Sequence, residues 1–105
     1  MPPNQYHEPP ADLSDEIRSL ARMIASLTEQ AEAIGWYEQR MSVEENDEAR
    51  AIMRNAQKEE FKHFTMDLEW LLRRKPIWRT LARQVLFTDG PIVEAGEEAE
   101  REAVH

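Results

Sequence analysis

Apolar residues recur at alternating spacings of four and three positions along the first third of this 105-residue chain. Because an α-helix turns once in about 3.6 residues, this spacing places them along one stripe of a single helix. The stripe predicts a helix from residue 13 to about residue 40, capped at its start by Asp12 or Ser14. The stripe consists of Leu13, Ile17, Leu20, Ile24, Leu27, Ala31 and Ile34.

A second long helix is predicted after a short loop. Asn46, which precedes two acidic residues, offers one start signal, and a Ser42-x-x-Glu45 capping box offers another. The segment 47–75 is rich in helix-forming residues and ends before a proline. Residues 76–87 then predict a short third helix with that proline in its first turn.

The two ends of the chain differ in composition from this helical region. Residues 1–11 hold four of the six prolines and predict an extended segment. Residues 94–105 carry five Glu and one Arg without an apolar period, and predict an acidic, disordered tail. The segment 12–93 is therefore predicted to be one helical domain.

The predicted hairpin of two long helices cannot bury its own apolar stripes. Each helix has one neighbour, so part of each stripe faces water unless another copy of the chain covers it. Two hairpins placed together make a four-helix bundle, in which facing helices line the binding sites. The predicted fold is all-α: an antiparallel two-helix hairpin plus a short C-terminal helix, dimerising into a four-helix bundle.

Composition excludes several classes of function. With no Cys, the chain can form neither disulfides nor thiolate metal sites, and with three Gly it has no phosphate-binding glycine loop. The net charge of −8 argues against nucleic acid, and no segment is apolar enough to span a membrane, so we expect a soluble cytoplasmic protein. One run of cations is interpreted as a helix end and a solvated face: Arg73, Arg74, Lys75, Arg79 and Arg83.

The second helix carries a candidate metal-binding pair. Glu60 and His63 form a Glu-x-x-His pair at i and i+3, and both side chains can reach one metal ion. Glu59 and Asp67 lie about 40° to either side of His63 around the helix. Such a pair also arises by chance in a Glu-rich helix, where it is a surface ion pair or a packed core histidine. An antiparallel hairpin brings Gln30 of the first helix to the level of this pair.

Several motifs resemble the encapsulated ferritins in order and spacing, over residues 7–93. They are Glu29-x-x-Glu32-x-x-x-Trp36-Tyr37-Glu38-Gln39-Arg40, Glu59-Glu60-x-x-His63, Met66-x-Leu68-Glu69-Trp70-Leu71-x-Arg73 and Leu86-Phe87-Thr88-x-Gly90-Pro91-Ile92. The resemblance implies a ferritin-like bundle that oxidises Fe(II) to Fe(III) at a di-iron centre across a subunit interface, for iron storage or detoxification. It further implies a homo-oligomer, either a dimer or a ring-shaped decamer, held inside an encapsulin nanocompartment.

The resemblance also implies roles for individual residues. Glu60 and His63 are metal ligands, and Tyr37 neighbours the centre. Glu29 and Glu32 form an outer acidic site where iron, calcium or another divalent cation enters.

The chain departs from the family at two places. The position of a bridging Glu holds Gln30, which offers one neutral oxygen in place of a carboxylate. Glu59 and Asp67 are the possible substitutes. An impaired centre of this kind would make the protein a non-catalytic metal-binding oligomer, which is the alternative to a ferroxidase. The acidic C-terminal end also differs from the short apolar tail that docks family members inside the shell.

Overall fold

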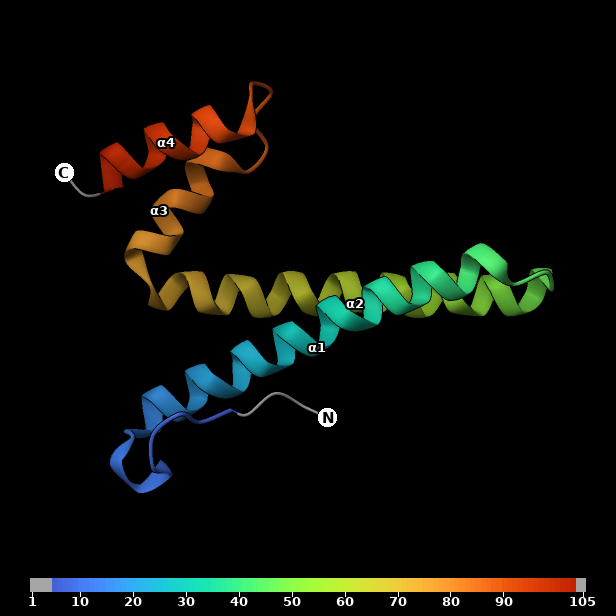
Figure 1. Ribbon diagram of the computed structural model, residues 1–105, viewed down its shortest axis with the longest axis horizontal. Coiled ribbons are helices and arrows are strands. Elements are labelled where there is room, and N and C mark those ends of the chain that lie inside the picture. Colours follow the sequence, from blue (N-terminus) through green and yellow to red (C-terminus); the bar gives the residue numbers. More distant parts are fainter. Residues whose placement is uncertain (1–4, 104–105) are drawn as a thin grey trace. The chain divides into compact units, whose positions relative to one another are not determined.

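The computed structural model describes residues 5–103, and within this range every regular element is helical. In chain order the elements are a short 3₁₀ helix over Pro10–Asp12, α1 over Asp15–Val43, α2 over Asp47–Arg74, α3 over Pro76–Val85 and α4 over Ile92–Ala103 (Figure 1). The chain divides into two compact units, Met1–Leu68 and Glu69–His105. The all-α prediction is confirmed.

Helix α1 begins and ends close to its predicted limits. The Ser14 side chain accepts a hydrogen bond of 3.2 Å from the backbone N–H of Ile17, so Ser14 is the cap. Two acidic residues in the first turn complement the positive end of the helix dipole. The helix closes at Glu44, whose N–H donates to the carbonyl of Arg40.

Helix α2 uses one of the two start signals that the sequence offers. The Asn46 side-chain oxygen accepts a hydrogen bond of 2.8 Å from the N–H of Ala49, which caps the helix. Ser42 is still part of α1, where its hydroxyl donates to the carbonyl of Gln39 at 2.6 Å. The connection between the helices is therefore only three residues long, from residue 44 to residue 46, and the two helices form a hairpin.

A buried amide joins the two helices of the hairpin. Gln57 on α2 is 7% exposed, and its Nε2 donates to the carbonyl of Ile34 at 3.2 Å and to Glu38 Oε2 at 2.8 Å, both on α1. The side chain spans the two helices and satisfies both donor hydrogens of its amide nitrogen. It thereby fixes which residues of α1 and α2 lie at the same level.

The apolar stripe of α1 remains incompletely covered in the protomer. Along the whole of α1, which the structure describes from end to end, no residue is fully buried. Ile17 and Ile24 on the stripe are 44% and 41% exposed. This agrees with the expectation that the hairpin alone does not bury its stripes. None of the described helices is long and apolar enough to cross a membrane.

In the second unit, α3 and α4 pack against each other. Ala99 of α4 is fully buried, and Gln84 of α3 donates a hydrogen bond to Glu102 of α4. The sequence predicted a disordered tail from residue 94, whereas the structure describes a helix up to residue 103. A small residue explains the difference, because Ala99 is the buried residue of α4 and it packs without a large apolar side chain that the sequence pattern could reveal. Residues 1–4 and 104–105 lie outside the described range.

The predicted ends of the short elements also shift. Helix α3 ends at Val85, two residues before its predicted end, and Phe87 follows with a positive φ of 64°. Residues 10–12, part of the segment predicted as extended, form the 3₁₀ turn, and its Pro10 carbonyl accepts two hydrogen bonds from Arg18 at 3.0 and 2.7 Å. Arg74 lies 3.6 Å from the centre of the Trp70 ring, a cation–π contact at the end of α2.

We expect Gln57→Ala to lower the free energy of unfolding by about 1–3 kcal/mol, because it removes the two hydrogen bonds that the buried amide donates to the Ile34 carbonyl and to Glu38. Urea denaturation followed by circular dichroism measures the change. Asn55→Ala, at an exposed position of the same helix, is the matched control and should leave stability nearly unaltered. Equal stability of the two variants would show that Gln57 does not hold the hairpin together.

Candidate metal centre

Glu60 and His63 lie side by side on α2. The Nδ1 of His63 is 3.8 Å from Glu60 Oε1, and the side chains are 45% and 25% exposed, respectively. At this distance the two groups form a loose pair and not a tight hydrogen bond. Their lone pairs remain accessible, so both side chains can bind one cation.

The register of the hairpin puts Gln30 at about the level of this pair. Since Gln57 faces Ile34, the antiparallel arrangement puts Gln30, about one turn earlier on α1, at the level of residues 61–64 on α2. The Oε1 atom of Gln30 is buried and accepts no hydrogen bond from any described residue. A buried acceptor without a donor is destabilising, by roughly 1–3 kcal/mol. A cation or a donor from another molecule would remove that cost.

A second buried oxygen near the pair lacks a partner. Asp67 follows His63 by about one helical turn, and its Oδ2 atom is buried without a hydrogen bond to the described residues. Buried carboxylate oxygens in proteins are normally hydrogen-bonded or bound to a cation. Two of the three unsatisfied buried side-chain atoms found among the described residues therefore belong to residues that the sequence associated with the metal centre.

Glu59 is differently placed. Its Oε2 lies 2.7 Å from Lys62 Nζ, and both side chains are at least half exposed. The hydrogen bond and positive charge of Lys62 hold the pKa of the Glu59 carboxyl below its ordinary value. Glu59 is therefore already neutralised by a cation of its own helix.

The remaining predicted residues line α1. Glu29 and Glu32 are exposed and lie one turn apart, and the structure brings no α2 ligand to them within the described residues. Tyr37 is half-buried, and the Arg40 guanidinium lies 5.5 Å from the centre of its ring. Tyr37 lies about two helical turns after Gln30 on the same helix.

The donor set fits iron, although one protomer provides only part of it. Carboxylate, imidazole and amide donors without thiolate suit iron or manganese, and the two orphaned oxygens are potential ligands beside Glu60 and His63. Among the residues that the structure describes, no group of three or more His, Asp or Glu is assembled closely enough to hold a metal ion. The sequence predictions for the individual ligands thus remain predictions.

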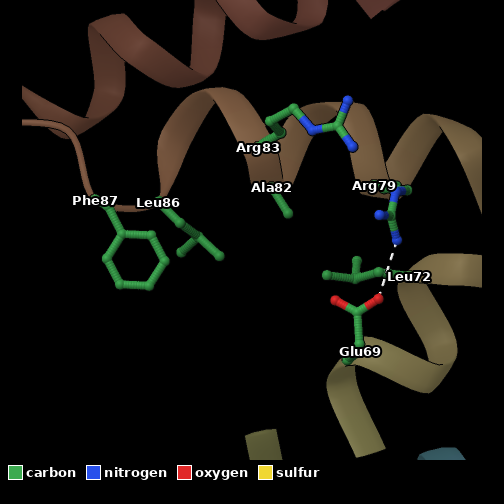
Figure 2. Close-up of a pocket in the computed structure, with 7 residues that line it drawn as sticks. All are labelled: Glu69, Leu72, Arg79, Ala82, Arg83, Leu86 and Phe87. Atoms are coloured by element: carbon green, nitrogen blue, oxygen red, sulfur yellow. Dashed lines mark hydrogen bonds and ion pairs between the residues drawn. The ribbon is translucent and has the colours of Figure 1, made fainter. Parts of the chain in front are cut away.

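A cavity of about 260 Å³ in the second unit involves none of these residues (Figure 2). Leu72, Leu86 and Phe87 form its apolar part, and Glu69 and Arg79 bind each other at 3.0 Å. Arg73 also binds Glu69, at 2.6 Å, and the two guanidinium groups hold the pKa of the Glu69 carboxyl below its usual range. With its carboxylate occupied in this way, the cavity offers no free acid, base or metal ligand at Glu69.

The sequence analysis overlooked Gln57. It is an uncharged helix-forming residue on a helix rich in Glu and Arg, so nothing in its residue type distinguishes it. The signal available was its position, since it precedes Glu60 by three residues and so lies about 60° from it, near the face that meets the first helix. Its amide sets the level at which Gln30 meets His63.

Comparisons with known proteins point to one family. The family model described as EncFtn-like matches residues 5–89. A ferritin-like protein of Thermotoga maritima is 42% identical over 95 residues, which cover 90% of this chain and 83% of the relative. An encapsulated ferritin-like protein of Rhodospirillum rubrum is 40% identical over 98 residues, covering 91% of this chain and 70% of the relative. A crystal structure of a protein from Nitrosomonas europaea matches with a TM-score of 0.80 and 40% identity, over 83% of this chain and 96% of that one.

We expect Lys62→Ala to raise the pKa of Glu59 towards its ordinary value, because the variant removes the hydrogen bond and the charge that favour the carboxylate. The ion pair holds above the lowered pKa of Glu59 and is lost as the pH falls through it. A pH titration of the carboxyl carbon by NMR measures the change. Lys58→Ala is the control and should give a smaller rise, since Lys58 acts on Glu59 only through its charge. Identical titrations of all three proteins would contradict the Lys62–Glu59 pairing.

Proposed function

This chain belongs to the EncFtn-like family, and we propose that it is an iron-oxidising member that acts on Fe(II) at a centre formed between two copies. The observation that carries the proposal is the Glu60–His63 pair on the hairpin, at the level of the orphaned Gln30 oxygen. Di-iron bundles use a Glu-x-x-His pair from each of two helices, together with carboxylates from two others. One copy supplies one such pair, so a symmetric dimer supplies two.

The proposed roles follow from the chemistry of each side chain. Glu60 and His63 of both copies bind the iron, and Gln30 contributes its neutral oxygen. Oxidation of Fe(II) to Fe(III) adds one positive charge to each iron, and carboxylates in an interface that excludes water stabilise that charge strongly. Tyr37 neighbours the centre. Glu29 and Glu32, exposed on α1, form the outer acidic site that attracts iron, calcium or another divalent cation before it reaches the centre.

The proposal extends to domain organisation and partners. Residues 12–93 form the ferritin-like domain, and the copies assemble as dimers that close into a ring-shaped decamer. The exposed apolar stripe of α1 supports assembly, because a second hairpin would cover it. The similarity to the encapsulated ferritin-like protein of Rhodospirillum rubrum supports a location inside an encapsulin shell, and through it in the cytoplasm.

One residue favours a second candidate function. Gln30 in place of a carboxylate weakens the stabilisation of Fe(III), and a centre that binds Fe(II) without oxidising it would make the protein a metal-binding helical oligomer. The two functions share the same ligands and differ in turnover. A single experiment with oxygen separates them.

We expect the protein to oxidise Fe(II) faster than buffer alone, and His63→Ala to reduce the rate to that of the buffer. Fe(II) is added anaerobically, oxygen is admitted, and the ferric absorbance is followed with time. His7→Ala is the matched control, because His7 is exposed and precedes the hairpin. Iron binding without faster oxidation in the wild type would favour the metal-binding oligomer. Unchanged iron binding in His63→Ala would overturn the site itself.

We expect metal to promote association of copies. With a net charge of −8 on each chain, copies repel each other until cations neutralise the acidic residues of the interface. Size-exclusion chromatography with light scattering, run with EDTA and then with Fe(II) or Ca²⁺ under nitrogen, measures the mass. A monomer under all three conditions would contradict a centre shared between copies.

A further inference from the structure

We infer that Asp67, and not Glu59, supplies the carboxylate that Gln30 lacks, as an additional ligand for divalent iron at the centre. The inference rests on the function proposed above and deepens it, because it specifies the ligand set of this chain. It joins the Gln30 oxygen, which the proposed function already uses, to an observation that the proposed function leaves unexplained: a buried carboxylate oxygen of Asp67 without a hydrogen-bond partner among the described residues.

One oxygen of the Asp67 carboxylate is buried. Asp67 Oδ2 has no donor among the described residues, although it is shielded from solvent. Removing a carboxylate oxygen from water without a hydrogen bond or a counter-charge is costly, so buried carboxylates are paired or coordinate cations. None of the ion pairs found among the described residues involves Asp67, and a bound divalent ion would supply the missing charge.

Asp67 lies on nearly the same face of α2 as Glu60. Asp67 follows Glu60 by seven positions, so the two residues lie about 20° apart around α2, on one face. His63 lies between them along the helix and about 40–60° to one side. The three donors therefore form a stripe along α2. The carboxylate that is missing at position 30 lies at the level of His63, and Asp67 lies one helical turn after His63.

Asp67 adds a negative charge to the proposed centre. With Glu60 alone, each protomer contributes one negative charge and two protomers contribute two, whereas a Glu at position 30 would bring the total to four. Adding Asp67 to Glu60 restores two negative charges per protomer and four per dimer. The carboxylate at position 67 thus replaces the negative charge that is lost at position 30, and the total charge available to iron is the same. Gln30 Oε1 remains as a neutral ligand on the facing helix.

Glu59 would restore the same charge, but it fails on burial and on direction. Its carboxylate is half exposed and already paired with Lys62 at 2.7 Å. It lies about 40° from His63 on the side opposite to Asp67, and so about 100° from Glu60. Recruiting Glu59 would require breaking an ion pair and turning the side chain towards a face that it does not share.

The test compares two variants of equal charge change on the same helix. Co²⁺ is titrated into the full-length protein under nitrogen, and its visible absorption bands report both occupancy and ligand environment. Asp67→Asn keeps the shape of the side chain and removes its charge, and we expect it to weaken Co²⁺ binding by about tenfold or more and to alter the bands. Glu59→Gln is the matched control and should leave both unchanged.

Rescue separates a ligand from a structural residue. In the double variant Gln30→Glu with Asp67→Asn, the carboxylate returns from the facing helix, so affinity for Co²⁺ should recover, although Asp67 is still absent. A loss caused by local misfolding would not recover in this way. Circular dichroism and light scattering confirm that each variant keeps its helix content and mass.

The outcomes distinguish this inference from the proposed function. If His63→Ala abolishes Co²⁺ binding while Asp67→Asn leaves it unchanged, the centre stands and the Asp67 assignment is overturned. If Glu59→Gln weakens binding and Asp67→Asn does not, Glu59 is the substitute ligand. If Asp67→Asn changes only the mass of the metal-free oligomer, its partner is a group on another copy and the assignment also fails. If His63→Ala leaves binding intact, the proposed function itself fails.

Discussion

The buried amide of Gln57 is the interaction on which the geometry of the hairpin depends. Two long helices can slide past one another, because apolar contacts alone discriminate poorly between neighbouring registers. A hydrogen bond from Gln57 to the Ile34 carbonyl and another to Glu38 exist in one register only. Displacement by a turn would leave a buried amide unsatisfied, so the level at which Gln30 meets His63 is held by a directional interaction and not by packing.

This fixed level explains why the candidate centre has polar groups in an energetically poor state. Gln30 Oε1 and Asp67 Oδ2 are both shielded from solvent, and neither has a hydrogen-bond partner among the described residues. The apolar stripe of α1 is also partly exposed in the protomer. Under the proposed assembly, association of two copies would bury the stripe, and bound cations would satisfy the two oxygens and neutralise the acidic residues of the interface.

The sequence predicted the hairpin because its signals are local. The 4-3 apolar period, the Ser14 and Asn46 caps and Pro76 each act within about one helical turn, and the structure places helix limits at these residues. Helix α4 was missed because its buried residue is the small Ala99, which carries almost no hydrophobic signal among five Glu. The role of Gln57 was missed because a polar residue reveals its burial only through the other helix. In the proposed centre the ligands would come from more than one chain, which one sequence does not show, and the buried oxygen of Asp67 is recognised only from the structure.

The turn after α3 holds a bulky residue in an unfavourable backbone conformation. Phe87 sits at a φ of 64° with its ring fully exposed, in a backbone region that strongly disfavours bulky side chains. Holding a non-glycine residue there costs of order 1–3 kcal/mol of stability. Because the ring is exposed to solvent, it gains little hydrophobic stabilisation to offset this strain. Glycine at this position would relax the turn. Because the strained backbone already presents the whole ring to solvent, a surface that covers Phe87 gains the burial of an aromatic side chain without first having to rearrange the turn that carries it.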